Sequence, residues 1–535
     1  MRKIILLLFF EVILILPSLL FGCKSYDVKE TTAVSTEAVL QPKPVENPLI
    51  HSIDELNITD YGYDSAKGNE NRASLVKDYR SSYTLAPSDF GGIEVYYPRI
   101  KKIDDDRYLL IFHNGIYGGS IYCCESSDCI NWSKPKQIFQ QSVISVNGNS
   151  DNLKYMTPDA CVLSDGRIIC VTAYRAEFTY YTKLDENGIA VSFSEDEGKT
   201  WSKPKIIYKG LNWEPSVLEA ENGEIYVYFT AIAPSIHLYG YDNVSAGVGM
   251  IRSKDGGKTW IPDVMTEPYQ SQYVMRQYVG TNENGIKIYN DGMPVARQLH
   301  NGSIALVVET FKDNNYMFSV SYNDDGYKED LGLDKSGPDN RQTNLFNLAG
   351  PYITQFDSGE TVLTYHWAGT MRYRIGTSDA KTFFDENVIL DGVGMWGSVE
   401  LTSSHSAVMA IGTDQYSLKV AKVYLNHDIS AIKMTPTFTA NTPEWDNNTD
   451  AIFVSGSSQA QMSVRIAHDD YFVYILGERL DDYITENDGS EFHILDGKGG
   501  KYIISVSGAN VSVKHQEGQK GKIIDIDAAD EGFRS

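Results

Sequence analysis

The 535-residue chain has few cysteines, little positive charge and few long apolar runs. Its 47 Lys and Arg face 71 Asp and Glu, and a net charge of −24 disfavours nucleic acid as a partner. No cysteine has the spacing of a zinc site with histidine partners, so we expect no structural metal. Beyond the first residues, no segment approaches ~18 unbroken apolar residues, the length that spans a bilayer. With 42% hydrophobic residues, 35 Tyr and 44 Gly, the composition favours a globular, β-rich protein.

The N-terminus has the order of an export signal. A basic start at residues 1–3 precedes an apolar run over residues 4–21, which Glu11 interrupts. The run ends in Leu20-Phe21-Gly22-Cys23, which resembles the lipobox of bacterial lipoproteins. The resemblance implies a lipoprotein signal peptide over 1–22, lipidation of Cys23, and export to the bacterial cell envelope, as a lipid-anchored protein of the outer membrane or periplasm. An ordinary signal peptide and an uncleaved anchor are the alternatives.

The polar segment after the signal and two of the cysteines also carry information. Residues 23–70 are mostly polar, contain three prolines and show no sustained period, which predicts a flexible tether. Cys161 and Cys170 flank the turn at residues 164–166 and could face each other across a hairpin. An exported protein permits a disulfide there, and two packed thiols are the alternative.

An internal repeat organises residues 71–428. Each copy has an anchor of two residues, a short strand, a turn and a second apolar strand that ends about 15 positions after the anchor. The six anchors are Tyr97-Pro98, Thr157-Pro158, Glu214-Pro215, Met293-Pro294, Gly350-Pro351 and Trp396-Gly397. The second strands end at Leu109–His113, Ile169–Ala173, Tyr226–Thr230, Ala305–Glu309, Val362–His366 and Val408–Gly412.

A second repeat lies between the anchors. Residues 194–201 and 253–260 both fit S-x-D-x-G-x-T-W, and degenerate copies lie at 126–132, 321–326 and 378–383. The pattern predicts a tight hairpin in which Gly permits a left-handed turn, Asp accepts from turn amides and Trp packs between sheets. It resembles the Asp-box of sialidase-type propellers, and we expect these turns to have a structural role. Six repeats over residues 71–428 predict an all-β, six-bladed β-propeller.

The repeat predicts two rings of side chains at one mouth of the central channel. The first ring holds the anchor residues Tyr97, Thr157, Glu214, Met293, Gly350 and Trp396, and the second holds the strand-end residues His113, Ala173, Thr230, Glu309, His366 and Gly412. Each ring has one carboxylate, and Glu214 and Glu309 belong to neighbouring blades. Two carboxylates in one cleft are what glycoside hydrolysis needs, although each alone could be a solvated or paired strand-end acid.

Other residues near the rings are candidates for binding a carbohydrate. Aromatic faces at Tyr97, Trp213 and Trp396 can stack on sugar rings. His113 and His366, two blades apart along one side of the circle, are expected to donate hydrogen bonds to sugar rather than to ligate a metal. The remaining candidates beside the rings are Arg99, Asp159, Tyr174 and Arg175. Arg99 and Asp159 could instead form an ion pair in the channel, and Asp159 could be a third acid.

The propeller is similar to the sialidase/BNR-repeat superfamily and, within it, to glycoside hydrolase family 93, the exo-arabinanases. That resemblance implies an exo-acting, retaining hydrolase with Glu214 as nucleophile and Glu309 as acid/base. A sialidase would have an Arg just before the first anchor proline, whereas in this chain Arg99 follows that proline. A sialidase would also have a Tyr nucleophile on the last blade, whereas this chain has Trp-Gly-Ser at residues 396–398. Sialidase is one alternative, and a catalytically inactive glycan-binding surface lipoprotein is another.

The rest of the sequence predicts a second domain and no cofactor. Residues 392–397 fit G-x-G-x-x-G but precede a strand, so no dinucleotide site follows. Short β runs within residues 429–535 predict a β-sandwich. There, residues 464–482 resemble family 9 carbohydrate-binding modules, and a sandwich without sugar affinity is the alternative. We expect a monomer with a carbohydrate substrate and a membrane contact through Cys23.

Overall fold

The computed structural model describes residues 67–240, 244–327, 341–392, 394–436, 445, 451–455, 461–480, 489–495, 500–507, 510–516 and 523–526. The predicted signal peptide, Cys23 and nearly all of the predicted tether lie outside these residues. No helix found in these ranges has the length and hydrophobicity of a transmembrane segment.

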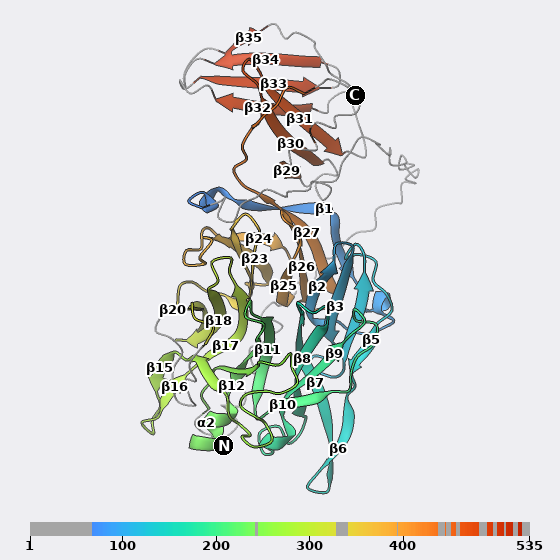
Figure 1. The fold of residues 1–535 in the computed structure, drawn as a ribbon, viewed down its shortest axis with the longest axis vertical. Helices are drawn as coiled ribbons and strands as arrows, with labels where there is room; N and C mark the ends of the chain where they lie inside the picture. The colour runs from blue at the N-terminus through green and yellow to red at the C-terminus, as the bar shows by residue number, and fades with distance from the viewer. Residues whose placement is uncertain are drawn as a thin grey trace, which may run out of the picture. The chain divides into compact units, whose positions relative to one another are not determined.

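Six antiparallel sheets, called sheets 1 to 6, follow one another along the chain (Figure 1). Sheet 1 consists of β2 (Tyr96–Asp104), β3 (Arg107–His113), β4 (Ile121–Ser126) and β5 (Lys136–Phe139), and sheet 2 of β6 (Ser142–Val146), β7 (Asn149–Val162), β8 (Ile168–Ala176), β9 (Gly188–Ser194) and β10 (Lys205–Lys209). Sheet 3 consists of β11 (Asn212–Glu219), β12 (Ile225–Ala231), β13 (Gly247–Ser253) and β14 (Gln272–Met275), and sheet 4 of β17 (Asp291–Gln298), β18 (Ile304–Lys312), β19 (Asn315–Asn323) and β20 (Arg341–Gln342).

The last two sheets complete the series. Sheet 5 consists of β21 (Ala349–Gln355), β22 (Thr361–Trp367), β23 (Thr370–Gly376) and β24 (Asn387–Leu390), and sheet 6 of β25 (Gly394–Ser403), β26 (Ser406–Thr413), β27 (Leu418–Asn426) and β1 (Ser74–Leu85). The hairpin β15 (Tyr278–Thr281) and β16 (Lys287–Tyr289) connects sheets 3 and 4. The helix α2 (Ala233–Tyr239) connects β12 to β13 within sheet 3, and the 3-10 turn η5 (Leu184–Glu186) connects β8 to β9 within sheet 2. The 3-10 turns η3 (Glu70–Arg72) and η4 (Pro87–Phe90) precede and follow β1. The predicted all-β class is confirmed.

The first repeat strands of the sheets lie against one another. In chain order β2 contacts β7, β7 contacts β11, β11 contacts β17, β17 contacts β21 and β21 contacts β25. The first and last of these strands, β2 and β25, also contact each other. Every anchor therefore lies on a strand that touches the corresponding strands of two other sheets.

The six anchors share one backbone feature. In each first strand, two anchor residues lie opposite a single residue of the second strand, which is a β-bulge. The first anchor residue always has a positive φ: Tyr97 54°, Thr157 50°, Glu214 46°, Met293 49°, Gly350 61° and Trp396 57°. A non-glycine residue in this region costs on the order of 1–3 kcal/mol, and such strain concentrates at functional sites. The predicted repeat is thus a repeated strained bulge, and its register makes the six positions equivalent.

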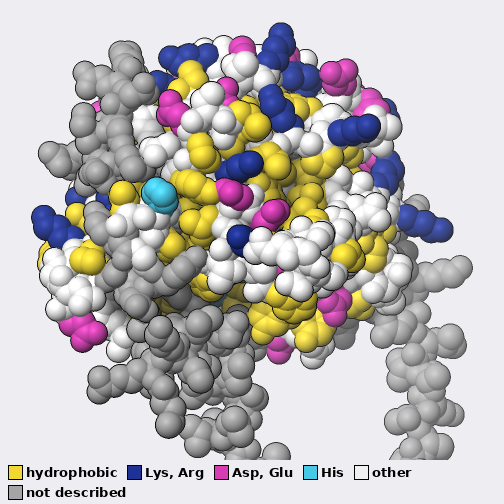
Figure 2. Space-filling model, turned by 90° about the horizontal axis from the view of Figure 1, so that it is seen from below, with side chains coloured by type: hydrophobic (Ala, Val, Ile, Leu, Met, Phe, Trp, Pro, Cys, Tyr) yellow, Lys and Arg dark blue, Asp and Glu magenta, His cyan; other side chains and the backbone are white. Residues whose placement is uncertain are grey.

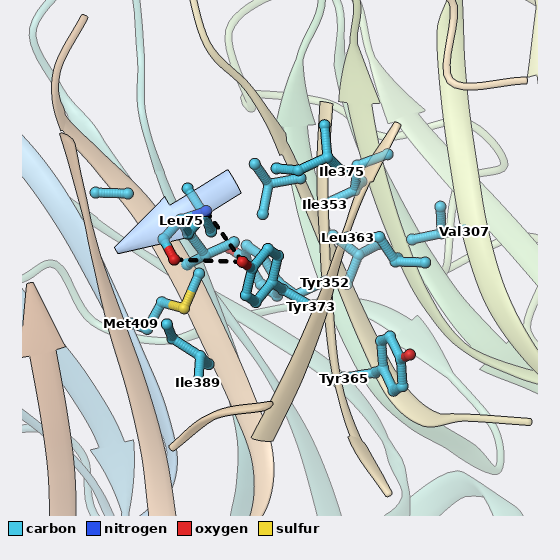
Figure 3. Packing of buried hydrophobic residues seen from close by; sticks show 14 of the residues in the cluster. Leu75, Val307, Tyr352, Ile353, Leu363, Tyr365, Tyr373, Ile375, Ile389 and Met409 are labelled. Atoms are coloured by element: carbon cyan, nitrogen blue, oxygen red, sulfur yellow. Dashed lines mark hydrogen bonds between the residues drawn. The ribbon is translucent and has the colours of Figure 1, made fainter. Parts of the chain in front are cut away.

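Sheet 6 joins the two ends of the repeat region. β1, which belongs to no repeat, pairs with β27 as the outermost strand of this sheet. Figure 3 shows how β1 is held in the core beside sheet 5. The backbone N–H of Leu75 donates to the Tyr373 hydroxyl (3.0 Å), which donates to the Leu75 carbonyl (3.3 Å), and Leu75 packs with Met409 and Ile375. The N-terminal strand therefore completes the last sheet.

The Asp-box hairpins have their predicted contacts. Asp255 accepts hydrogen bonds from the Thr259 amide (2.9 Å), the Thr259 hydroxyl (2.6 Å) and the Ser253 hydroxyl (2.8 Å), and Asp196 repeats the set in sheet 2. Trp260 is buried in a cluster that unites sheets 2 and 3. In the degenerate copy near residue 378, the hydroxyl that bonds Asp379 comes from Thr377 (2.6 Å), one residue earlier than the sequence match suggested.

Cys161 and Cys170 are both free thiols. Cys161 pairs in register with Ile169, whereas Cys170 pairs with Ala160. Neighbouring residues of a strand face opposite sides of the sheet, so the two sulfur atoms point apart. Cys161 accordingly packs beside the cluster shared with sheet 3, and Cys170 lies in the cluster shared with sheet 1. Of the two alternatives left by the sequence, the structure has the packed thiols.

The C-terminal region contains two four-stranded sheets. One consists of β28 (Ile432–Lys433), β29 (Ile452–Ser455), β30 (Gln461–His468) and β31 (Val473–Leu480), and the other of β32 (Gly489–Leu495), β33 (Lys501–Ser507), β34 (Asn510–Gln516) and β35 (Ile523–Ile526). Within the predicted carbohydrate-binding motif, Tyr471 and Phe472 lie in the turn before β31. Residues 481–482 of the predicted carbohydrate-binding motif lie outside the described residues.

Candidate active site

The two predicted rings lie at the same end of the six sheets. Each second-ring residue pairs directly with the residue that precedes the anchor of its own sheet; for example Thr230 pairs with Trp213, and Glu309 with Gly292. This end of sheet 3 is where α2 follows β12, at the bottom of Figure 1. Figure 2 views the molecule from that side, and acidic and basic side chains lie together near the middle of this face among hydrophobic ones.

Glu214 is a partly buried carboxyl on the strained bulge of β11. Its Oε2 accepts a hydrogen bond from the Thr230 hydroxyl (3.1 Å). Burial raises the pKa of Glu214 to about 7, while the charge of Arg175 and the Thr230 hydrogen bond act in the opposite direction. A carboxyl with a pKa near 7 gains and loses its proton near neutral pH, and groups that act as acids or bases in catalysis have pKa values in this range.

Glu309 is a second partly buried carboxyl, three residues before the end of β18 in sheet 4. Its Oε2 accepts from the backbone N–H of Gly350 (2.8 Å), the anchor of sheet 5. Burial raises the pKa of Glu309 to about 8; the Gly350 hydrogen bond lowers it, and the negative charge of Glu214 raises it further. The structure connects the two acids through Thr230, which bonds both Glu214 Oε2 (3.1 Å) and the Met293 amide (3.0 Å), while Gly292, the residue before Met293, pairs with Glu309.

Two neutral histidines belong to the second ring. Burial lowers the pKa of both His113 and His366 to about 4. The Nδ1 atom of His366 lies 3.5 Å from the backbone N–H of Trp396, the anchor of sheet 6. Since a neutral imidazole that accepts at Nδ1 carries its proton on Nε2, His366 presents a fixed N–H donor. His113 stacks on Tyr96, with ring centroids 5.5 Å apart.

Arg99 and Asp159 contact the protein rather than each other. The Arg99 guanidinium lies 3.8 Å from the Tyr97 ring centroid and donates to the carbonyls of Pro98 (2.9 Å), Trp396 (2.9 Å) and Gly397 (3.2 Å). Asp159 instead forms an ion pair with Lys101 (3.2 Å) and accepts from the Val217 amide (3.1 Å). Both side chains are buried and link neighbouring first strands. No Arg99–Asp159 ion pair is found among the described contacts.

The remaining predicted residues separate into two groups. Tyr174 is buried within the core shared by sheets 1 and 2, 6.5 Å from the Tyr155 ring. Arg175, in contrast, donates to the Asn212 carbonyl (2.8 Å) and lies over the ring of Trp213 (5.5 Å). Tyr97 and Trp396 are neighbours, with ring centroids 6.2 Å apart. Trp213, Tyr97 and Trp396 therefore supply aromatic rings from three sheets.

Two tyrosines beside the carboxyls were not predicted from the sequence. Burial raises the pKa of Tyr316, on β19, and the charges of Glu309 and Glu214 raise it further. Tyr180, in the loop after β8, lies 5.0 Å from the Arg175 guanidinium, and the Glu214 charge acts on it as well. Neither residue belongs to a repeat position, so only the register of β18 with β19 could have indicated Tyr316. Across the described residues, no group of three His, Cys, Asp or Glu side chains could hold a metal ion.

No protein-family model matches the chain, and no curated protein matches it. Among solved structures, the chain is similar to a protein of unknown function from Dyadobacter fermentans (TM-score 0.48, 14% identity, 66% of this chain and 99% of that one). It is also similar to Penicillium chrysogenum alpha-L-arabinanase complexed with arabinobiose (0.45, 16%, 66% and 98%) and to Trypanosoma rangeli sialidase in complex with sialic acid (0.41, 12%, 85% and 88%).

These similarities concern the arrangement of small antiparallel sheets. The last two structures are glycosidases, and the first has no known function. At 12–16% identity they do not transfer a reaction or a substrate to this chain. No comparison supports the resemblance of residues 464–482 to family 9 carbohydrate-binding modules, which stays a prediction. The function is therefore inferred from the residues of the site.

Proposed function

We propose that the six sheets close into a six-bladed β-propeller and that the chain is an exo-acting glycoside hydrolase. The contact of β2 with β25, at the two ends of the series, supports closure. The hydrolase proposal rests on one observation above all. Glu214 and Glu309 come from neighbouring sheets, the charge of Glu214 raises the pKa of Glu309, and the two pKa values are about 7 and about 8.

The two environments assign the two roles. Glu214 has the lower pKa, with Arg175 and the Thr230 hydroxyl favouring its charged form, so it is the nucleophile. Glu309 has the higher pKa and is the acid, which gives its proton to the leaving glycosidic oxygen as the bond to the anomeric carbon breaks. Glu214 forms a glycosyl ester, and Glu309, now a carboxylate, takes a proton from the water that cleaves the ester. The anomeric configuration is retained.

The surroundings of the pair favour an uncharged sugar. Trp213 and Trp396 are partly exposed and supply faces that can stack on a sugar ring, whereas Tyr97 is buried beneath the Arg99 guanidinium. The cations closest to them, Arg99 and Arg175, already donate to backbone carbonyls, so neither is reserved for a substrate carboxylate. Sialic acid, which carries a carboxylate, is thus a weaker candidate than a neutral residue such as arabinose.

Release of sugar from aryl glycosides and arabino-oligosaccharides tests the proposal. Glu309→Gln should lose roughly 10²–10⁴-fold in kcat on substrates with poor leaving groups and much less on dinitrophenyl glycosides, where azide should restore turnover. Glu214→Gln should lose activity on every substrate. The matched control is Glu219→Gln at the far end of β11, where Glu219 bonds the backbone and hydroxyl of Ser164. Wild-type activity in both site variants would contradict the proposal.

We propose further that Cys23 carries a lipid anchor and that residues 23–70 hold the enzyme off the membrane of an exported lipoprotein. The Leu20–Cys23 motif supports the anchor, and the polar, proline-containing composition supports the tether. Detergent-phase partitioning tests this, since Cys23→Ala should move the protein into the aqueous phase. Partitioning that does not change in the variant would contradict lipidation at Cys23.

A further inference from the structure

The strained bulge exposes a backbone amide that needs an acceptor. At three successive sheets, the acceptor is the second-ring residue of the preceding sheet. Thr230 Oγ1 accepts from the Met293 amide (3.0 Å), Glu309 Oε2 from the Gly350 amide (2.8 Å) and His366 Nδ1 from the Trp396 amide (3.5 Å). Each of these side chains thereby has one polar atom committed to the backbone of the next sheet.

This commitment fixes the direction of the Thr230 hydroxyl. Thr230 is 3% exposed, and its oxygen accepts from Met293 on one side. Its single proton is then directed to Glu214 Oε2, 3.1 Å away. A hydroxyl that donates to a carboxyl stabilises the ionised form of that carboxyl. The bond also holds Oε2, which leaves Oε1 of Glu214 as the oxygen that can attack.

We propose that Thr230 is a positioning residue that keeps Glu214 ionised and presents its Oε1 to the substrate. The inference rests on the proposed function, because it assigns Glu214 the nucleophile's role. Substitution at residue 230 leaves the other titratable groups around Glu214 in place. Arg175 from β8 lowers the Glu214 pKa, and the charge of Glu214 acts on Glu309 from β18, Tyr316 from β19, Tyr97 from β2 and Tyr180 from the loop after β8. Removing the hydroxyl therefore isolates one contribution.

A purely structural role is the rival explanation, since Thr230 also ties sheet 3 to sheet 4 through Met293. Thr230→Val removes both hydrogen bonds at almost constant volume, and Thr230→Ser keeps both. The matched control is Thr172→Val. Thr172 is fully buried in sheet 2, and its hydroxyl donates to the Met156 carbonyl (2.8 Å), with no carboxylate as partner.

The decisive measurement is a titration of Glu214 by carbon NMR of protein labelled at the glutamate carboxyl carbons, with Glu214→Gln providing the assignment. Thr230→Val should raise the Glu214 pKa by roughly one to two units, because a hydrogen bond to a charged group has that strength. In kinetics, kcat at pH 7 should fall roughly tenfold or more, while KM changes little. Thr230→Ser should restore both, and Thr172→Val should leave the Glu214 pKa unchanged.

The outcomes separate the inference from the proposed function. An unchanged Glu214 pKa in Thr230→Val overturns the positioning role, whatever the activity. A raised pKa in a protein that hydrolyses no glycoside supports the effect of Thr230 on ionisation and contradicts the proposed function. If Thr230→Val does not fold, Thr230→Cys, a weaker donor of similar size, should show a smaller shift in the same direction. No shift in that variant also overturns the role.

Discussion

Replacing Glu309 by glutamine should stabilise the folded protein at neutral pH. Burial and the neighbouring charge of Glu214 raise the Glu309 pKa from 4.5 to about 8. A carboxyl with a higher pKa in the folded than in the unfolded chain opposes folding wherever the unfolded chain ionises it. That penalty is absent below pH 4.5 and grows as the pH rises towards 8. Glutamine removes the charge and can still accept from the Gly350 amide with its side-chain oxygen.

The size of the effect follows from the pKa difference. At pH 7 the pH is about two and a half units above the pKa of the unfolded carboxyl, and each unit is worth about 1.4 kcal/mol, which gives an upper bound of about 3.5 kcal/mol. Glu309 is only partly buried, so solvent screens part of the penalty. We expect Glu309→Gln to gain about 2 kcal/mol in the free energy of unfolding at pH 7 and nothing at pH 4.

Urea denaturation of the wild type and of Glu309→Gln, at a series of pH values between 4 and 8, measures this difference. Glu219→Gln is the control, because Glu219 lies at the far end of β11 from Glu214 and accepts hydrogen bonds from Ser164. A stability difference that does not change with pH would refute the reasoning. So would a loss of stability in Glu309→Gln that grows as the pH rises.

Three further predictions concern the pH dependence and the scaffold. The pH profile of kcat/KM should be bell-shaped, with limbs near 7 and near 8, because activity requires ionised Glu214 and protonated Glu309; a profile flat from pH 5 to 9 would contradict this. Asp255→Ala removes three hydrogen bonds from an Asp-box turn, so it should lower the urea midpoint while kcat stays unchanged. Tyr373→Phe removes the hydroxyl that bonds both backbone groups of Leu75, and it should cost about 1 kcal/mol in the free energy of unfolding, measured in urea.

The repeat in the sequence carries most of what could be predicted of the site. Counting from the anchors placed Glu214 and Glu309 at equivalent ends of neighbouring sheets, because the bulge keeps the same register in all six copies. The left-handed backbone that defines the anchor was not predictable, since proline more often restricts its predecessor to extended conformations. Five of the six anchor residues are not glycine and yet have a positive φ.

Contacts between sheets were harder to predict from the sequence than the positions of the anchors. Arg99 and Asp159 occupy equivalent positions in adjacent sheets, which suggested an ion pair between them. Asp159 instead forms its ion pair with Lys101, which lies two residues after Arg99 on β2. β1 has no counterpart in the repeat, and its place in sheet 6 depends on pairing with β27, more than 300 residues away. The proposed role of Thr230 depends on the direction of its hydroxyl proton. The position of the Met293 amide sets that direction, and it is known only from the structure.

A double-mutant cycle tests most directly whether the two acids act on the same substrate. The values of kcat/KM would be compared for the wild type, Glu214→Gln, Glu309→Gln and the double variant, on an aryl glycoside with a poor leaving group, whose cleavage needs the proton of Glu309. If the acids form one catalytic unit, each single change should cost several orders of magnitude, and the double variant should be little worse than the poorer single one. Losses that simply multiply, or a single variant with wild-type turnover, would contradict a shared site.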